Sequence, residues 1–170
     1  MRSEDLRAVQ TPLKDRYRED PAAAAVTLEA EGRLDDGISC SVTTGAALAH
    51  AGLHPATGGD GTSLCSGDML LQALVACAGV TLRAVATSLE IPVAGGTVRA
   101  EGDLDFRGTL GVSKDAPVGF SAVRLHFQLD SDATAEQIET LTRLTERYCV
   151  VYQTLARPPV LHLSTDRRAR

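Results

Sequence analysis

The chain has 170 residues, of which 44% are hydrophobic and 23% charged, as in an ordinary globular protein with one sizeable core. Its formal net charge of −5 argues against a nucleic acid as partner, because binding a phosphate backbone requires a basic face.

Residues 1–20 are charged throughout and contain no apolar signal-peptide core, so we expect an N-terminal arm or extension and no export. From residue 21 to residue 170 we expect a single domain. Residues 23–34 and 37–44 predict two strands joined by a turn, which is a hairpin pattern. Residues 45–63 are rich in Gly and Ala and predict an irregular loop.

A long helix is expected next, capped by Ser63 or Ser66, with Asp68 in its first turn and its end near Leu89. Its first half is apolar on nearly every side, which predicts a central core helix. The apolar stretch at residues 68–82 is shorter than the roughly 20 apolar residues that span a bilayer. We therefore expect no membrane partner and a cytoplasmic location.

Alternating hydrophobicity in residues 97–108 and 121–130 predicts two half-buried strands of an antiparallel sheet. In the second strand the side chains expected to face inward are Val123, Leu125, Phe127 and Leu129. Residues 158–165 predict a last strand, which begins with two prolines and therefore suits a sheet edge.

Residues 132–149 predict a second helix, with Thr134 as its N-cap and Gln137 completing a capping box. The order of elements is then β-β-α-β-β-α-β. This order predicts an α+β fold in which an antiparallel sheet packs against two helices.

The chain contains four cysteines: Cys40, Cys65, Cys77 and Cys149. Structural disulfides belong mainly to small secreted proteins, so we expect reduced thiols. Cys40 lies in a strand pattern and suits the core. Cys65 lies near a helix start, where the helix dipole could lower its pKa, so a third redox sulfur and simple packing both remain open.

Cys77 lies in the middle of the apolar helix, and two interpretations are open. Free cysteine packs as a small hydrophobe. Apolar burial alone raises the pKa of a thiol and leaves it inert. A reactive Cys77 would therefore need a cation or hydrogen-bond donor from another element, because its helical neighbours are uncharged: Ala73, Leu74, Val80 and Thr81.

Cys149 follows the end of the second predicted helix, where the chain can turn its sulfur inward. A thiolate that attacks a peroxide becomes a sulfenic acid, and a second thiol protects that acid from further oxidation. A two-cysteine peroxidase would need such a pair, but only folding can bring Cys77 and Cys149 together.

The stretch "GDMLLQALVACAGVTL" (residues 67–82) and residues 98–155, which contain "ERYCVVYQTL", resemble the OsmC family, which includes the organic hydroperoxide resistance proteins. The resemblance spans the chain apart from its first twenty or so residues. It implies an intertwined homodimer with two sheets flanking two long central helices and active sites at the subunit interface. It also implies that Cys77 is the peroxidatic thiolate and Cys149 the resolving thiol, in a disulfide that an external dithiol reduces.

The resemblance implies two further site residues. Arg33 matches an arginine in the loop after the first strand that steadies the thiolate, although an exposed turn arginine fits the pattern as well. The better-known peroxidases carry a glutamate ten residues before the first cysteine, where this chain has Gly67. Asp68 is the nearest acid, and other branches of the family carry an acid at that place.

Apolar residues around the thiolate would select an organic hydroperoxide: Met69, Leu70, Leu74 and Val80. The alternative function, favoured by the departure at Gly67, is a dimeric binding protein with a small apolar ligand in the interface pocket. A zinc site is conceivable at His50, His54, Cys40 and Cys65. The spacing is poor, however, and we expect neither a metal nor another cofactor.

Overall fold

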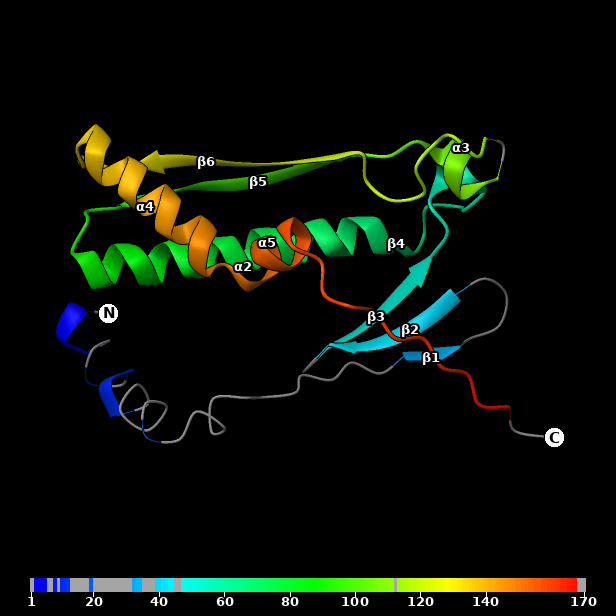
Figure 1. Ribbon diagram of the computed structural model, residues 1–170, viewed down its shortest axis with the longest axis horizontal. Helices are drawn as coiled ribbons and strands as arrows, with labels where there is room; N and C mark the ends of the chain where they lie inside the picture. The colour runs from blue at the N-terminus through cyan, green and yellow to red at the C-terminus, as the bar shows by residue number, and fades with distance from the viewer. Residues whose placement is uncertain are drawn as a thin grey trace.

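The computed structural model describes residues 2–5, 8, 10–12, 19, 32–34, 39–44, 47–111 and 113–167. Side chains are described from residue 49 onward within the long described ranges, and the strands before it are described by their backbone. A two-stranded and a four-stranded sheet lie on opposite sides of one long helix, α2 (Ser66–Leu89) (Figure 1). The predicted division at residue 20 stays a prediction.

The first sheet contains β1 (Gly32–Leu34), β2 (Ser39–Thr44), β3 (Ala47–Gly52) and β4 (Leu64–Cys65), in that order. β1 pairs antiparallel with β2, as the hairpin prediction requires, although the turn between them lies outside the described residues. The prediction of a loop over residues 45–63 is wrong for β3, which pairs with β2 along its full length, but is confirmed for residues 53–63, whose one regular element is the short 3-10 helix Pro55–Thr57. Strand β3 is stabilised by backbone hydrogen bonds to β2. Its side chains are mostly small, so the sequence has little alternation of hydrophobic and polar residues that would predict a strand.

Helix α2 spans the predicted range but is not capped as predicted. Cys65 is its N-cap residue and makes no side-chain capping bond, while Ser66 is already helical. The helix ends at Glu90, which adopts the left-handed conformation with φ 57° and donates its N–H to the carbonyls of Ala86 and Thr87.

The buried stripe of α2 repeats every four residues: Leu74, Ala78, Leu82 and Ala86. Within the described residues, α2 is long and apolar enough by length and composition to cross a bilayer, so the expectation that the segment is too short is wrong. The helix is longer than its most apolar core because it continues to Leu89. A core helix of a soluble protein passes the same test.

The second sheet pairs β5 (Gly95–Asp103) with β6 (Ala122–Asp130) in antiparallel register. Both predicted strands are confirmed. The inward alternation of β6 holds at Leu125, Phe127 and Leu129, but the expectation for Val123 is wrong, because its side chain is exposed. The end of the first predicted strand, residues 104–108, is instead mostly a short helix, α3 (Phe106–Thr109). The Asp105 carboxylate accepts a hydrogen bond from the Arg107 N–H and starts this helix.

Helix α4 (Ala135–Tyr148) carries the predicted capping box, since the Thr134 hydroxyl accepts from Gln137 N and the Gln137 side chain accepts from Thr134 N. A further helix, α5 (Val150–Ala156), follows directly and was not predicted. The predicted last strand at residues 158–165 is wrong, because this segment is exposed and forms no ladder. Its two prolines lack the N–H donors that a ladder needs.

The core divides into two clusters along α2. Around Leu141, which is fully buried, the first cluster joins the C-terminal half of α2 to α4: Leu82, Ala86, Ile91 and Leu141. The second cluster joins the middle of α2 to the start of α5: Leu74, Ala78 and Cys149. The second cluster also contains the two cysteines of the candidate site, because Cys149 belongs to it and Cys77 packs against it.

Candidate active site

The structure brings Cys77 and Cys149 together, although 72 positions separate them in the sequence. Cys77 lies in the middle of α2 and is half-buried, whereas Cys149 is fully buried. Cys149 is the one extended residue between α4 and α5, with φ −73° and ψ 110°, so it ends the first helix and begins the second. This break turns its sulfur toward α2, and both thiols are free.

Burial by itself would raise the pKa of the Cys77 thiol, but hydrogen bonds outweigh it and hold the pKa below its ordinary value. The groups that lower it are, in order of effect, the backbone N–H of Val151, the thiol of Cys149, the backbone N–H of Val150 and the hydroxyl of Thr81. Each donor favours the charged form of the sulfur. The Cys77 thiol is therefore more acidic than an ordinary cysteine thiol.

Cys149 shifts the other way. Burial raises the pKa of its thiol most, and the neighbouring Cys77 raises it further; the backbone N–H groups of Tyr152 and Val151 oppose this rise without reversing it. Cys149 is therefore the less acidic thiol of the pair.

The donors come from the first turn of α5, where the backbone N–H groups of a helix have no partner within the helix. An anionic sulfur satisfies them. The sequence predicted that a reactive Cys77 needs a hydrogen-bond donor from another element, but it did not predict α5 as the source of that donor. The signal that could have found it is the apolar run "CVVYQTLA", with Cys149 at the N-cap position.

Glu146 and Tyr152 support the start of α5. Burial raises the pKa of the Tyr152 hydroxyl, as do the charge of Glu146 and its hydrogen bond with that side chain. The Glu146 carbonyl also accepts a hydrogen bond of 2.9 Å from Gln153 Nε2. These contacts hold the last turn of α4 against α5 and so fix the N–H groups near Cys77.

The structure does not bring Asp68 to Cys77 within one chain. Nine residues of α-helix advance about 13 Å through about two and a half turns, which places Asp68 on the opposite side of α2. A Cβ at Gly67 would meet only ordinary contacts, the nearest being Phe120 at 3.5 Å, so packing does not require glycine there. Arg33 lies on β1, but its side chain lies outside the described residues.

The predicted apolar lining is only partly present. Leu74 shares the cluster of Cys149 and Cys77, whereas Val80 is 72% exposed. Met69 and Leu70 lie about two turns before Cys77 on α2. A separate apolar hollow of about 400 Å³ lies along α2, lined by Asp68, Leu71, Gln72, Val75, Ala76 and Ala100.

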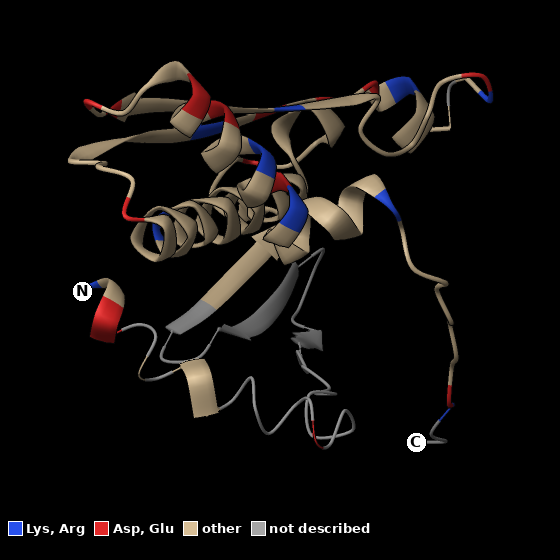
Figure 2. Ribbon diagram, turned by 60° about the vertical axis from the view of Figure 1, so that its left-hand side comes forward, with Lys and Arg blue, Asp and Glu red and all other residues tan. Residues whose placement is uncertain are grey.

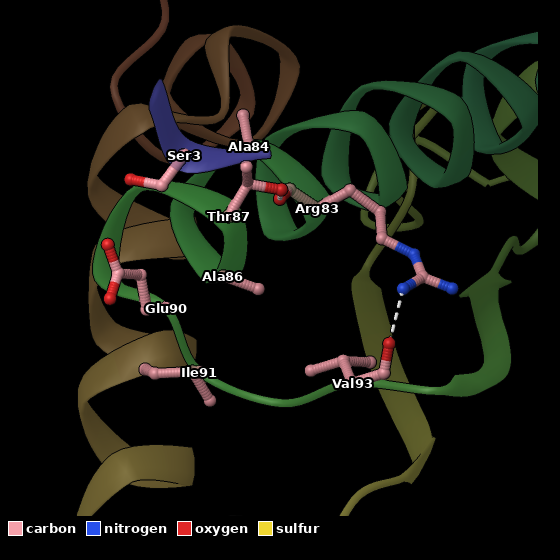
Figure 3. A pocket seen from close by; sticks show the side chains of 8 residues that line it. All are labelled: Ser3, Arg83, Ala84, Ala86, Thr87, Glu90, Ile91 and Val93. Carbon is pink, nitrogen blue, oxygen red and sulfur yellow. Dashed lines mark hydrogen bonds between the residues drawn. The ribbon is translucent and has the colours of Figure 1, made fainter. Parts of the chain in front are cut away.

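A larger hollow of about 650 Å³ lies at the far end of α2 (Figure 3). Arg83 reaches across it and donates 2.6 Å and 3.5 Å hydrogen bonds to the carbonyls of Val93 and Ala94. None of the described residues that line this hollow carries a thiol. Its arginine braces the chain between α2 and β5, and the hollow takes no part in the thiol chemistry.

Cys65 lies apart from the thiol pair. It lines a hollow of about 370 Å³ at the start of α2, together with His54 and Asp68. The ring of His54 stacks on Phe106 with 5.0 Å between centroids. Among the residues that the structure describes, no group of three or more metal-ligating side chains comes together. The side chain of Cys40 lies outside them.

A family model described as OsmC-like protein matches residues 59–164, which is more than half of the chain and contains both thiols of the pair. No curated protein matches this sequence.

Solved structures have the same fold. An OsmC-like protein from Mycoplasma pneumoniae is 16% identical with a TM-score of 0.66, covering 78% of this chain and 89% of that one. An organic hydroperoxide resistance protein OsmC from Legionella pneumophila is 18% identical with a TM-score of 0.60, covering 76% and 89%. An organic hydroperoxide resistance protein from Elizabethkingia anophelis is 19% identical with a TM-score of 0.61, covering 79% and 90%.

Proposed function

The chain belongs to the OsmC-like family, and from this membership we propose that it is a thiol-dependent peroxidase that reduces organic hydroperoxides. Cys77 is the peroxidatic residue and Cys149 the resolving residue. The observation that carries the proposal is the contact between a sulfur supplied with hydrogen-bond donors and a neighbouring, less acidic thiol. The names of the Legionella and Elizabethkingia proteins support organic hydroperoxides as the substrate class.

The reaction balances with these two residues. The Cys77 thiolate attacks the terminal oxygen of the hydroperoxide, the O–O bond breaks, and the alkoxide takes a proton from water to become the alcohol. Cys77 is then a sulfenic acid. Cys149 attacks its sulfur, the S–O bond breaks, and the Cys149 proton leaves with the hydroxyl group as water. An external dithiol reduces the resulting disulfide.

We further propose a homodimer in the cytoplasm. The face of α2 away from Leu74 and Ala78 is apolar but exposed, and Val80 is 72% exposed on it. A second copy of α2 would cover that face, since monomers rarely leave a large apolar surface in water. Asp68 and Arg33 could then act on the thiolate of the partner copy. The free thiols of the described cysteines suit a reducing compartment.

Stopped-flow mixing of the reduced protein with cumene hydroperoxide tests the proposal. We expect the loss of two thiols per turnover, and no reaction in Cys77→Ser. Cys149→Ser should lose one thiol and stop at the sulfenic acid, which mass spectrometry identifies. Cys65→Ser is the matched control and should react like the unmodified chain. A rate no faster than that of free cysteine would contradict the proposal.

A second candidate function is a dimeric binding protein for a small apolar ligand. The apolar hollow beside Leu71, Val75 and Ala100 favours it, as does Gly67 in place of the acid. In that case native mass spectrometry of the purified protein would detect a bound small molecule, and Cys77 would react slowly with peroxide.

A further inference from the structure

A groove of about 510 Å³ runs over the outer side of the junction between α4 and α5. Its walls come from the end of one helix and the length of the next: Arg147, Tyr148, Cys149, Val150, Gln153 and Arg157 among others. Cys149 lines this groove and Cys77 does not. The groove therefore approaches the pair of thiols from the side of Cys149.

Two arginines give the groove a positive charge in a chain whose net charge is −5. The Arg147 guanidinium lies 5.4 Å from the centre of the Tyr148 ring, which orients it without neutralising it. In the part of the chain that the structure describes, neither Arg147 nor Arg157 pairs with a carboxylate. Basic segments are visible along α4 and at the end of α5 (Figure 2).

We propose that this groove binds thiol reductants that carry an anionic group, and that the reductant attacks the sulfur of Cys149 rather than that of Cys77. The inference rests on the proposed function, because it concerns the reduction of the Cys77–Cys149 disulfide. Arg147 and Arg157 bind the anion and leave the thiol end of the reductant over Cys149. Cys149 is fully buried, so the attack requires α5 to shift, and the extended backbone of Cys149 between the two helices is the joint that we propose for this shift.

The exchange proceeds in two balanced steps. The reductant thiolate attacks Cys149 Sγ, the bond between the two protein sulfurs breaks, and its electron pair leaves on Cys77. The N–H groups of Val150 and Val151 stabilise that leaving thiolate. A second reductant thiolate then attacks the reductant sulfur of the mixed disulfide, and Cys149 leaves and takes a proton from water. Two electrons pass from two thiols to the protein disulfide.

The test starts from the whole chain oxidised with diamide, so that it does not depend on any reaction with peroxide. The disulfide is reduced at low ionic strength with 2-mercaptoethanesulfonate or with 2-mercaptoethanol, which carry a sulfonate and a hydroxyl group respectively. Each rate is normalised to the same thiol's rate with hydroxyethyl disulfide. We expect the sulfonate to react about fivefold faster, as two exposed charges imply.

In the double variant Arg147→Gln, Arg157→Gln, the normalised rates of the sulfonate and of the hydroxyl reductant should become about equal, by the same reasoning. Arg143→Gln removes an exposed arginine of α4 outside the groove, and should keep the preference. Acid quenching and peptide mass spectrometry should find the reductant attached to Cys149.

The inference would be overturned by a reductant adduct on Cys77. It would also be overturned by equal normalised rates of the two reductants in the unmodified chain, or by a preference for the sulfonate that is unchanged in the double variant. Failure of diamide to link the two cysteines would overturn it as well. If the disulfide forms with diamide and shows the preference while cumene hydroperoxide does not react, the proposed peroxidase function fails and the reductant groove stands.

Discussion

Cys77 and Cys149 pack against each other, and this contact adds to opposite shifts in the pKa values of the two thiols. It lowers the pKa of Cys77 and raises that of Cys149, because a donated proton stabilises the acceptor as an anion and holds the donor in its neutral form. The two thiols therefore differ in acidity, which suits the roles that we propose for them.

The reactivity of Cys77 should depend on pH with a midpoint below that of a free thiol, because the pKa of its thiol is lowered. A lowered pKa means more thiolate at neutral pH, so alkylation by iodoacetamide should reach its plateau at lower pH. Thr81→Val removes one donor and should move the midpoint upward. Peptide mass spectrometry of Cys77 measures it.

Thr87→Val is the control for that variant. The Thr87 hydroxyl donates a 2.8 Å hydrogen bond to the Arg83 carbonyl further along the same helix, away from the thiols. Its loss should leave the midpoint for Cys77 unchanged. A profile equal to that of free cysteine in the unmodified chain would contradict the activation of Cys77.

The exposed face of α2 should hold two copies together. Val80→Glu places a charge in this apolar surface, and we expect sedimentation velocity to detect a monomer in place of a dimer. Val118→Glu alters another valine, 65% exposed and outside α2, and should leave the dimer intact. If the unmodified chain sediments as a monomer at micromolar concentration, the proposed homodimer is refuted.

Leu141→Ala should lower the free energy of unfolding by about 2–5 kcal/mol, because it opens a cavity where α4 packs on α2. Denaturant unfolding followed by circular dichroism measures the change. Leu163→Ala removes the same atoms from a side chain that is 97% exposed, and we expect a change below about 0.5 kcal/mol. Equal effects of the two substitutions would be incompatible with the described packing.

Thr134→Ala should cost about 1 kcal/mol of unfolding free energy, because it removes the acceptor for Gln137 N at the start of α4. Thr134→Ser keeps a hydroxyl in the same place and should retain most of the stability. The same denaturant experiment compares the two variants. A loss as large in Thr134→Ser as in Thr134→Ala would mean that the hydroxyl is not the stabilising group.

Local patterns predicted those elements whose signal lies within a few neighbouring residues. The capping box of Thr134 and Gln137 was correct, because both hydrogen bonds form within one turn. The alternation in β6 was correct from Leu125 to Leu129, because one face of that strand packs inward. β3 was missed, since a strand of small residues is specified by its partner β2 rather than by its own pattern.

The sequence by itself determined which segment becomes the apolar helix, which two cysteines to examine and the family they indicate, because all of these are properties of order and spacing along one chain. Only the tertiary structure decided that the pKa of the Cys77 thiol is lowered. Its donors are N–H groups of α5, a helix that begins 73 positions later in the sequence. A hydrogen bond to sulfur acts over a few ångströms, so only folding could place those donors there.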